Sequence, residues 1–261
     1  MPEDGLRLSQ RSRNGDAIAS KESYSRYRAP ASQKEVWLSE ALAGTGRLGA
    51  AKQMSLMPDA KPERIAGDMK IFYSGRLDLL RTPCVAVVGT RKLSDPGVRR
   101  TQRIARELSE AGVTVVSGLA AGVDAVAHKT AIETGGATIA VIGTPLDKAY
   151  PAENAQLQEA IYQDHLLVSQ FENGVKVFRS SFPARNKLMA TLSDATVIME
   201  ASDTSGTLHQ AAECSRLGRW LFIARSVAED PSLEWPAKFL RLSNCVVLDD
   251  VKDILTRLPI N

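Results

Sequence analysis

Cysteines, histidines and long apolar runs are scarce in this sequence of 261 residues. The three cysteines (Cys84, Cys214 and Cys245) are scattered without metal-ligand spacing, which is typical of reduced, packed thiols in a cytoplasmic protein. Three histidines without a Cys/His cluster argue against a zinc site, and we expect neither a metal nor a cofactor. No apolar run approaches the roughly 20 residues of a membrane span, and the polar N-terminus does not resemble a signal peptide. These absences exclude a disulfide scaffold and a membrane protein.

The small excess of positive charge is confined to one end of the chain. The net charge is +3, and residues 1–34 alone hold seven Lys/Arg and four Asp/Glu. The remainder is therefore neutral overall, with 26 residues of each sign. If the folded part binds nucleic acid, it does so through a local cluster of cations and not through a general positive field.

The composition changes along the chain and divides it into four segments. We expect a disordered basic arm (residues 1–34), a small helical extension (35–80), a Rossmann-like core (81–230), and a C-terminal strand and helix that complete it (231–261). In the arm, Tyr24 and Tyr27 lie among arginines and are compatible with nucleic-acid contact, although a solvated tail is the simpler interpretation. In the extension, apolar residues at helical spacing predict a helix from Lys34 that stops at Gly44.

From Cys84 onward, short apolar segments alternate with helical ones. The expected strands are Val85–Val88, Val113–Val116, Ile139–Ile142, Leu166–Ser169, Ala195–Met199, Trp220–Ala224 and Val246–Leu248. They are apolar on both faces, as a buried parallel sheet requires. Helix ends are marked by Asp95-Pro96 at a start and by Gly112, Gly135 and Gly218 at stops. The pattern predicts an α/β fold with a Rossmann-like, doubly wound and mostly parallel sheet, plus the helical N-terminal extension.

Glycines and small polar residues follow several of these strands. Gly89, Ser117-Gly118, Gly143 and the stretch from Ser202 to Thr207 each come directly after a strand. The carboxyl ends of parallel strands share one edge of the sheet, so these turns should converge on one crevice. Each glycine alone is equally compatible with a tight turn, but together they favour close backbone approach to a phosphate.

Arg91, in the turn after the first core strand, narrows the choice of ligand. The turn reads Gly-Thr-Arg-Lys, without the dinucleotide fingerprint or a Walker A sequence, and no acidic residue closes the second strand. A guanidinium in this position can grip a phosphate with two hydrogen bonds, while the alternative is a surface ion pair.

Six motifs follow one another over roughly Met69 to Ala224, namely "VAVVGTR", "VVSGLAAGVDAVAH", "TIAVIGTPLDKAYPAEN", "SFPARNKLMATLSDATVIMEAS", "SGTLHQAAE" and "GRWLFIA". In sequence and order they resemble the DNA-processing protein A (DprA/Smf) family. The resemblance implies a Rossmann-like core that binds single-stranded DNA as a homodimer and helps to load a RecA-type recombinase, in natural transformation where bacteria are competent. Here "FIARSVAED" lacks the family's Pro-Gly turn and no winged-helix pattern follows, as in a short or divergent member.

The resemblance also implies a set of binding residues. Arg91 corresponds to the arginine of a Gly-Ser-Arg turn that grips DNA phosphate, and Phe182 and Arg185 correspond to the aromatic and basic residues of a Phe-Pro-x-Arg-Asn motif. The expected phosphate- and nucleic-acid-binding residues are Gly89, Thr90, Arg91, Ser117, Gly118, Gly143, Arg179, Phe182, Arg185, Asn186, Lys187, Ser205, Gly206 and Thr207. Aromatic rings between cations in "KVFRSSFPARNK" suit a single strand, because stacking ignores base identity. The alternative is that Phe182 packs in the core. We expect Glu200 either to orient Arg185 or Asn186 or to accept a hydrogen bond from a ribose or a base.

Two other functions are alternatives to DNA binding. Phosphoribohydrolases of the "LOG" type share a related core and use a glutamate after a Gly-Thr pair, where this chain has Gln210. A neutral amide cannot stabilise an oxocarbenium-like centre as a carboxylate can, so we expect no enzyme activity. A sensor of a small nucleotide would keep the pocket without chemistry and stays open.

Overall fold

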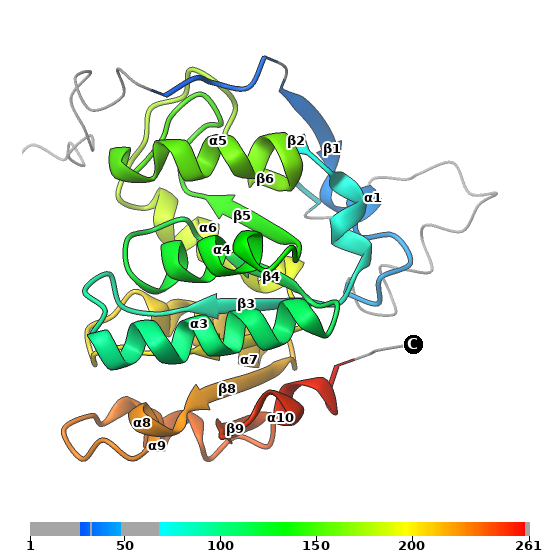
Figure 1. Ribbon diagram of the computed structural model, residues 1–261. Coiled ribbons are helices and arrows are strands. Elements are labelled where there is room, and N and C mark those ends of the chain that lie inside the picture. Colours follow the sequence, from blue (N-terminus) through cyan, green and yellow to red (C-terminus); the bar gives the residue numbers. More distant parts are fainter. Residues whose placement is uncertain (1–26, 32, 48–67, 259–261) are drawn as a thin grey trace, which may run out of the picture.

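A single mixed sheet lies at the centre of the molecule (Figure 1). The structure is a computed structural model that describes residues 27–31, 33–47 and 68–258. In these residues the sheet has nine strands in the order β1-β2-β6-β5-β4-β3-β7-β8-β9. The strands are β1 (Lys34–Trp37), β2 (Lys70–Gly75), β3 (Cys84–Val88), β4 (Thr114–Ser117), β5 (Thr138–Ile142), β6 (Leu166–Ser169), β7 (Ala195–Ile198), β8 (Trp220–Ala224) and β9 (Cys245–Leu248). All strands from β3 to β9 run parallel, which confirms the predicted fold class.

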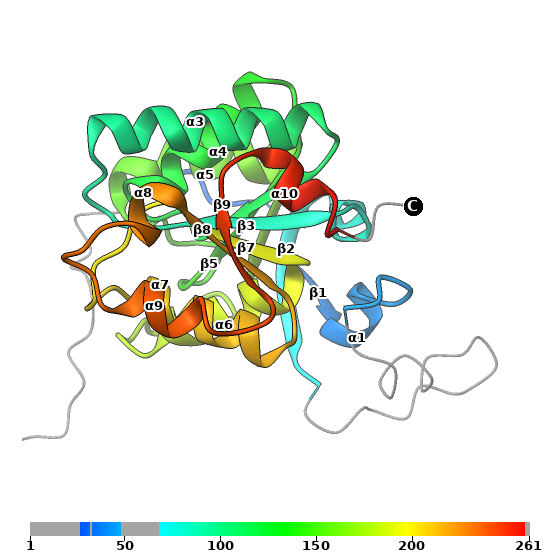
Figure 2. The same cartoon turned by 90° about the horizontal axis from the view of Figure 1, so that it is seen from below.

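Helices cover both faces of the sheet. They are α1 (Leu38–Ala41), η2 (Leu77–Arg81), α3 (Asp95–Glu110), α4 (Val123–Glu133), η3 (Ala152–Asn154), α5 (Ala155–Asp164), α6 (Ser181–Leu192), α7 (Thr207–Arg216), α8 (Arg225–Ala228), α9 (Trp235–Phe239) and α10 (Val251–Leu255). Figure 2 shows α3, α4 and α5 on one face and α6, α7 and α9 on the other. The central strands are buried on both faces, so their apolar side chains hold the two helical layers together.

The extension before the core differs from the predicted helical cap. Lys34–Trp37 is a strand that pairs with Lys70–Gly75, and the latter pairs antiparallel with β6. One helical turn, α1, follows β1 directly. Pairing in the sheet satisfies backbone groups of these short segments, and this tertiary pairing outweighs their helical spacing. The apolar residues of this stretch still contribute to the core, since Leu38, Ala41 and Leu42 are buried.

Two helix starts and three helix stops can be compared with the residues that mark helix ends in the sequence. The N-cap of α3 is Ser94, whose hydroxyl accepts from the Gly97 N–H at 3.0 Å, so Asp95 is the first helical residue and not the cap. Gly112, Gly135 and Gly218 have φ of 75°, 70° and 68° and end their helices as predicted. The last helix is capped by Asp250 in a reciprocal arrangement with Asp253.

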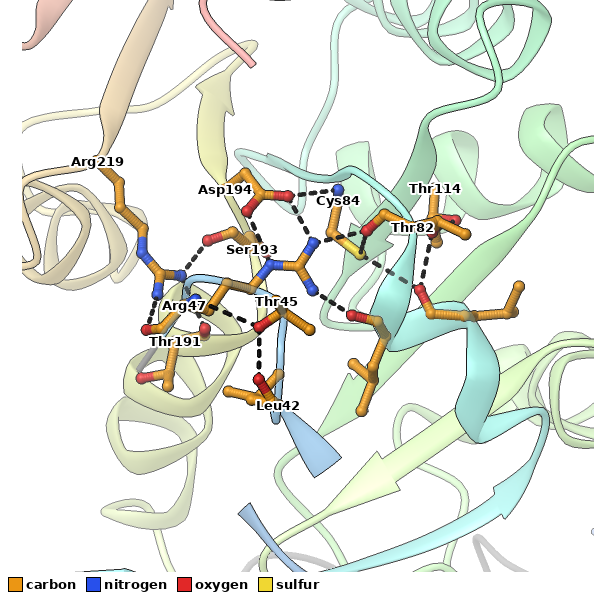
Figure 3. A network of polar contacts seen from close by, with 12 residues as sticks. Leu42, Thr45, Arg47, Thr82, Cys84, Thr114, Thr191, Ser193, Asp194 and Arg219 are labelled. Carbon is orange, nitrogen blue, oxygen red and sulfur yellow. Dashed lines mark hydrogen bonds and ion pairs between the residues drawn. The ribbon is translucent and has the colours of Figure 1, made fainter. Parts of the chain in front are cut away.

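Arg47 fastens the extension to the core at the amino-terminal ends of β3 and β7 (Figure 3). Its guanidinium donates to both carboxylate oxygens of Asp194, at 2.8 and 2.5 Å, and to the Leu80 and Thr82 carbonyls. The same carboxylate accepts from the Cys84 N–H at 2.8 Å, while Arg219 donates to the Arg47 carbonyl. Because Asp194 precedes β7 and Cys84 begins β3, this network lies at the opposite end of the strands from the predicted crevice.

The described part of the arm is held by α5. The Tyr27 hydroxyl donates to the Leu146 carbonyl at 2.9 Å and accepts from the Gln158 amide at 2.9 Å. Its ring meets Tyr162 edge-on, with centroids 6.4 Å apart. Burial raises the pKa of the Tyr27 hydroxyl. Tyr27 is therefore part of the packed structure and not of a solvated tail, while Tyr24 lies outside the described residues.

Candidate functional site

The chain changes direction across the sheet between β3 and β7. From β3 it proceeds through β4 and β5 to β6, and it then returns to place β7 on the other side of β3. The helices that follow these two strands, α3 and α7, consequently lie on opposite faces (Figure 2). Loops that diverge in this way leave a crevice at the carboxyl ends of the strands, which is where doubly wound folds bind ligands.

A cavity of about 340 Å³ occupies this position, and we call it the crevice. Its wall includes nine of the residues predicted from the sequence, namely Gly89, Thr90, Arg91, Phe182, Arg185, Asn186, Ser205, Gly206 and Thr207. A smaller cavity of about 60 Å³ adjoins it, shares Arg91, Phe182 and Arg185, and is lined in addition by Gly118 and Gly143. The turns after β3, β4, β5 and β7 therefore converge as expected from the topology.

Arg91 stands at the rim of the crevice with its side chain exposed. Its Cζ atom lies 5.9 Å from the centroid of the Phe182 ring, within the range of a cation–π contact. The loop that carries it is fixed on both sides: the Thr90 N–H donates to the Glu200 carbonyl at 2.7 Å, and the Thr90 carbonyl accepts from the Val123 N–H at 3.2 Å. A fixed loop with an exposed guanidinium suits the capture of an anion.

Phe182 forms a side wall shared by both cavities. A Cβ atom added to Gly143 would lie 2.9 Å from the ring, and the Tyr150 ring centroid is 5.4 Å away. Gly143 is thus needed so that the ring can lie directly against the turn after β5. The ring is half-buried, with packing on one side and the crevice on the other.

Arg185 is turned inward and is 6% exposed. Its guanidinium donates to the carbonyls of Gly118 and Val141, while Nε donates to the Asn186 side chain at 2.9 Å. Burial lowers the pKa of Arg185, and the nearby Asp124 carboxylate opposes that shift. The guanidinium thereby braces the turns after β4 and β5 from within the crevice wall.

Asp124 is the acidic partner in this buried arrangement. Its carboxylate accepts from the N–H groups of Gly118 and Ala120, at 3.1 and 3.3 Å. Burial raises the pKa of Asp124, and Arg185 works against the rise.

The remaining predicted residues divide into two groups. Thr207 donates to the Gly89 carbonyl at 3.3 Å and Asn186 to the Gly206 carbonyl at 3.2 Å, so these side chains join the loops around the crevice. Three residues line neither cavity, namely Ser117, Arg179 and Lys187. Ser117 is buried and donates to the Val87 carbonyl at 2.7 Å, whereas Arg179 and Lys187 are exposed.

Glu200 does not have the expected partners. Its carboxylate accepts from the Ser94 hydroxyl at 2.5 Å and from Arg100 at 2.9 Å, so it braces the start of α3. The expectation that it orients Arg185 or Asn186 is wrong. The residue follows β7 by two positions, and its side chain points toward the α3 face of the sheet and not into the crevice.

Gly122 is a site residue that sequence reasoning missed. It precedes α4 with φ of 76°, and an added Cβ would overlap the carbonyl oxygen of Thr90 and lie 2.8 Å from the Arg91 carbonyl. Only glycine lets α4 begin directly beneath the Arg91 turn. The signal was present as the second glycine of "SGLAAGVD".

Among the described residues, no group of His, Cys, Asp or Glu is placed to hold a metal ion. In the same residues, no helix is both long enough and apolar enough to cross a membrane. His128 on α4 is fully buried and bonds through Nδ1 to the Thr138 hydroxyl at 2.7 Å.

The fold and the crevice define a Rossmann-like protein with an exposed arginine at the rim of a crevice at its topological switch point. The family model for DNA recombination-mediator protein A matches residues 63–259, and the chain belongs to this family. Protein Smf of Synechocystis is 44% identical over 156 residues, which are 58% of this chain and 39% of Smf. DNA processing protein DprA of Streptococcus pneumoniae is 43% identical over 152 residues, 58% of this chain and 54% of its own length. The chain thus spans about half the length of these curated relatives, or less.

Solved structures of two family members share the fold. The X-ray structure of DprA from S. pneumoniae superimposes with a TM-score of 0.67 at 36% identity, covering 74% of this chain and 67% of that one. The Helicobacter pylori protein superimposes with a TM-score of 0.65 at 29% identity, covering 72% and 85%. The work on the latter concerns the single-stranded DNA binding mode of that protein.

Proposed function

We propose that this protein binds single-stranded DNA in the crevice, with Arg91 gripping a backbone phosphate and Phe182 contacting a base. The observation that carries the proposal is the placement of an exposed guanidinium 5.9 Å from a half-buried ring at the switch point of the sheet. A phosphate needs the first group and an unpaired base needs the second. The H. pylori relative, whose single-stranded DNA binding mode has been described, supports the assignment.

The dimensions of the crevice favour a single strand over a duplex. A volume of about 340 Å³ is of the size that takes a small ligand and not a double helix. In a duplex the bases are stacked on one another and cannot meet Phe182, whereas an unpaired base can lie on the ring. The backbone turns at Gly89 and Gly206 permit close approach.

We propose further that the protein binds its ligand without catalysing a reaction. Gln210 occupies the place of the hydrolase glutamate and is fully buried. In the amide orientation that suits both neighbours, its nitrogen donates to the Asn186 carbonyl and its oxygen accepts from the Thr196 hydroxyl. A side chain held in this way supports α6 and offers no carboxylate to a sugar.

We also propose that the protein acts as a homodimer in the cytoplasm and delivers the strand to a RecA-type recombinase during recombination or DNA uptake. The family's description as a recombination mediator supports this role. Strand exchange by RecA on DNA covered with single-stranded-DNA-binding protein should start sooner when this protein is added. Sedimentation at micromolar concentration should give twice the mass of one chain. An unchanged lag would argue against delivery to the recombinase. A single-chain mass would argue against the homodimer.

A titration with labelled oligothymidylate and with a duplex of equal length tests the main proposal. We expect the single strand to bind at least about tenfold more tightly, and Arg91→Ala to weaken that binding by about tenfold or more. If three to five cations meet phosphates, the slope of log K against log salt should be about −2 to −4. Unchanged affinity in Arg91→Ala would overturn the assignment, and a flat salt response would indicate a small buried nucleotide instead.

A further inference from the structure

A second recess adjoins the Arg91 turn on the opposite side from the crevice. It has a volume of about 530 Å³ and lies between the start of α3, the first turns of α4, and η3, and we call it the α3–α4 groove. The helices α3 and α4 lie side by side on one face of the sheet (Figures 1 and 2). The groove shares Arg91 with both cavities described above and Ala121 with the smaller one.

The lining of the groove has a cationic rim and an aliphatic floor. The cations are Arg91, Lys92 and Lys129, and the acidic residue among its described lining residues is Glu153. Leu93, Val98, Ala121, Ala125 and Val126 supply apolar surface between them. Lys92 and Lys129 are exposed, so both ammonium groups are accessible to a polyanion. This combination resembles the crevice itself, which also joins a cation to a surface that accepts the face of a base.

The α3–α4 groove and one further recess both border the Arg91 turn and could continue the crevice, but their charges differ. The further recess has a volume of about 390 Å³ and is lined by Lys92 and Arg100 but also by Glu200 and Asp230. Arg100 is paired with Glu200 at 2.9 Å, so its charge is already neutralised. The α3–α4 groove has three cations against one carboxylate, and it is therefore the path that a chain of phosphates would follow.

The Arg91 turn is held at the divide between crevice and groove. Gly122 lets α4 begin against the backbone of Thr90 and Arg91, as described above. The turn is further fixed because the Lys92 N–H donates to the Thr90 hydroxyl at 3.2 Å. The guanidinium is thus placed where one phosphate can be shared between the two recesses, and Lys92 follows it directly toward the groove.

We propose that the single strand bound in the crevice crosses the rim of the sheet at Arg91 and continues in the α3–α4 groove, where Lys92 and Lys129 bind the following phosphates and a base lies on the aliphatic floor. The inference rests on the proposed function. It adds a second binding segment and predicts that the site accommodates more nucleotides than the crevice alone.

The experiment measures the affinity of oligothymidylates of about 4 to 16 nucleotides for the full chain and for three variants. The double variant Lys92→Ala/Lys129→Ala should weaken binding of the longest oligonucleotides by about tenfold and of the shortest by much less, since two phosphate contacts are lost only where the strand reaches the groove. For long strands, the slope of log K against log salt should be shallower by about 1.4 in this variant, because each lost phosphate contact removes about 0.7. Lys238→Ala is the matched control, because Lys238 is an exposed lysine on α9 beside Glu234.

A photo-crosslinking measurement reads the path independently of affinity. A long oligothymidylate that carries 4-thiothymidine should attach to the peptide that contains Ala125, Val126 and Lys129. Strong effects of Arg91→Ala together with unchanged long-strand affinity in the double variant would overturn the groove and leave the crevice standing. If Arg91→Ala and the double variant both left every oligonucleotide bound as before, the proposed function itself would fail. Loss of binding equal at all lengths would also contradict the groove.

Discussion

The guanidinium of Arg91 lies over the ring of Phe182, with its Cζ atom 5.9 Å from the ring centroid. One residue comes from the turn after β3 and the other from the first turn of α6, so the contact spans the mouth of the crevice. A cation over the face of a ring is held in place without a carboxylate that would neutralise it. The arrangement therefore keeps the positive charge available while limiting where the side chain can go.

The first prediction concerns the coupling between these two residues. Phe182→Leu should weaken binding of single-stranded DNA by about fivefold to tenfold, because a stacking surface worth about 1–3 kcal/mol per base is lost. The double variant Arg91→Ala/Phe182→Leu should lose less affinity for DNA than the two single losses multiplied together, because each single change also disturbs the other residue. Fluorescence titration of all four proteins gives the coupling. Strictly additive effects would show that the contact plays no part in binding.

The second prediction uses Gly122, whose lack of a side chain lets α4 begin against the Arg91 turn. Gly122→Ala should weaken DNA binding by about tenfold without removing a charge, because the new methyl group displaces the Thr90–Arg91 backbone. Gly135→Ala is the matched control: it has φ of 70°, yet no atom lies within 4 Å of the added Cβ. Both substitutions strain the backbone by about 1 kcal/mol. Only the first should alter affinity, and equal affinities of the two variants would contradict the proposed role of Gly122.

Parts of the fold and of the candidate site could be predicted from the sequence, and other parts could not. The parallel strands were predictable because they are apolar on both faces, and the crevice followed because their carboxyl ends share an edge. The strands β1 and β2 were missed because they depend on a sheet edge that the local sequence does not reveal. Nor does the sequence show whether a cation points inward: Arg185 is buried against Gly118 and Val141, while Lys187, two positions further on α6, is exposed.

The third prediction concerns the network that attaches the extension. Asp194→Asn should lower the free energy of unfolding by about 3–5 kcal/mol, because it leaves the Arg47 charge buried without its partner. Arg47→Met/Asp194→Asn should be more stable than Asp194→Asn alone, since the uncompensated charge is then absent. Urea unfolding measures both values. The affinity of the folded protein for DNA should stay unchanged in Asp194→Asn, because the network lies at the other end of the strands.

The fourth prediction concerns catalysis. Incubation with nucleoside monophosphates should release no free base above the level of a protein-free control, measured by chromatography. The physical reason is that Gln210 is a buried amide that bonds within the protein and cannot stabilise positive charge on a sugar. Release that Gln210→Ala abolishes would contradict the proposal that the protein only binds.

The fifth prediction follows from His128 on α4. Burial lowers the pKa of this imidazole to about 3, against about 6.5 in the unfolded chain. Below about pH 6.5 the unfolded state binds a proton that the folded state does not, so stability is lost as the pH falls from about 6.5 toward 3, by about 1.4 kcal/mol per pH unit. The pKa of the half-buried His165 is also lowered and contributes with the same sign.

His128→Asn isolates the contribution of His128, because the amide can still donate to the Thr138 hydroxyl but does not titrate. Between pH 7 and pH 5 the unmodified protein should lose about 2 kcal/mol more stability than the variant, since His165 and the carboxylates are common to both. Urea unfolding at the two pH values measures the difference. Parallel losses in the two proteins would mean that His128 takes up a proton in the folded state, which its burial beside Thr138 without a carboxylate partner argues against.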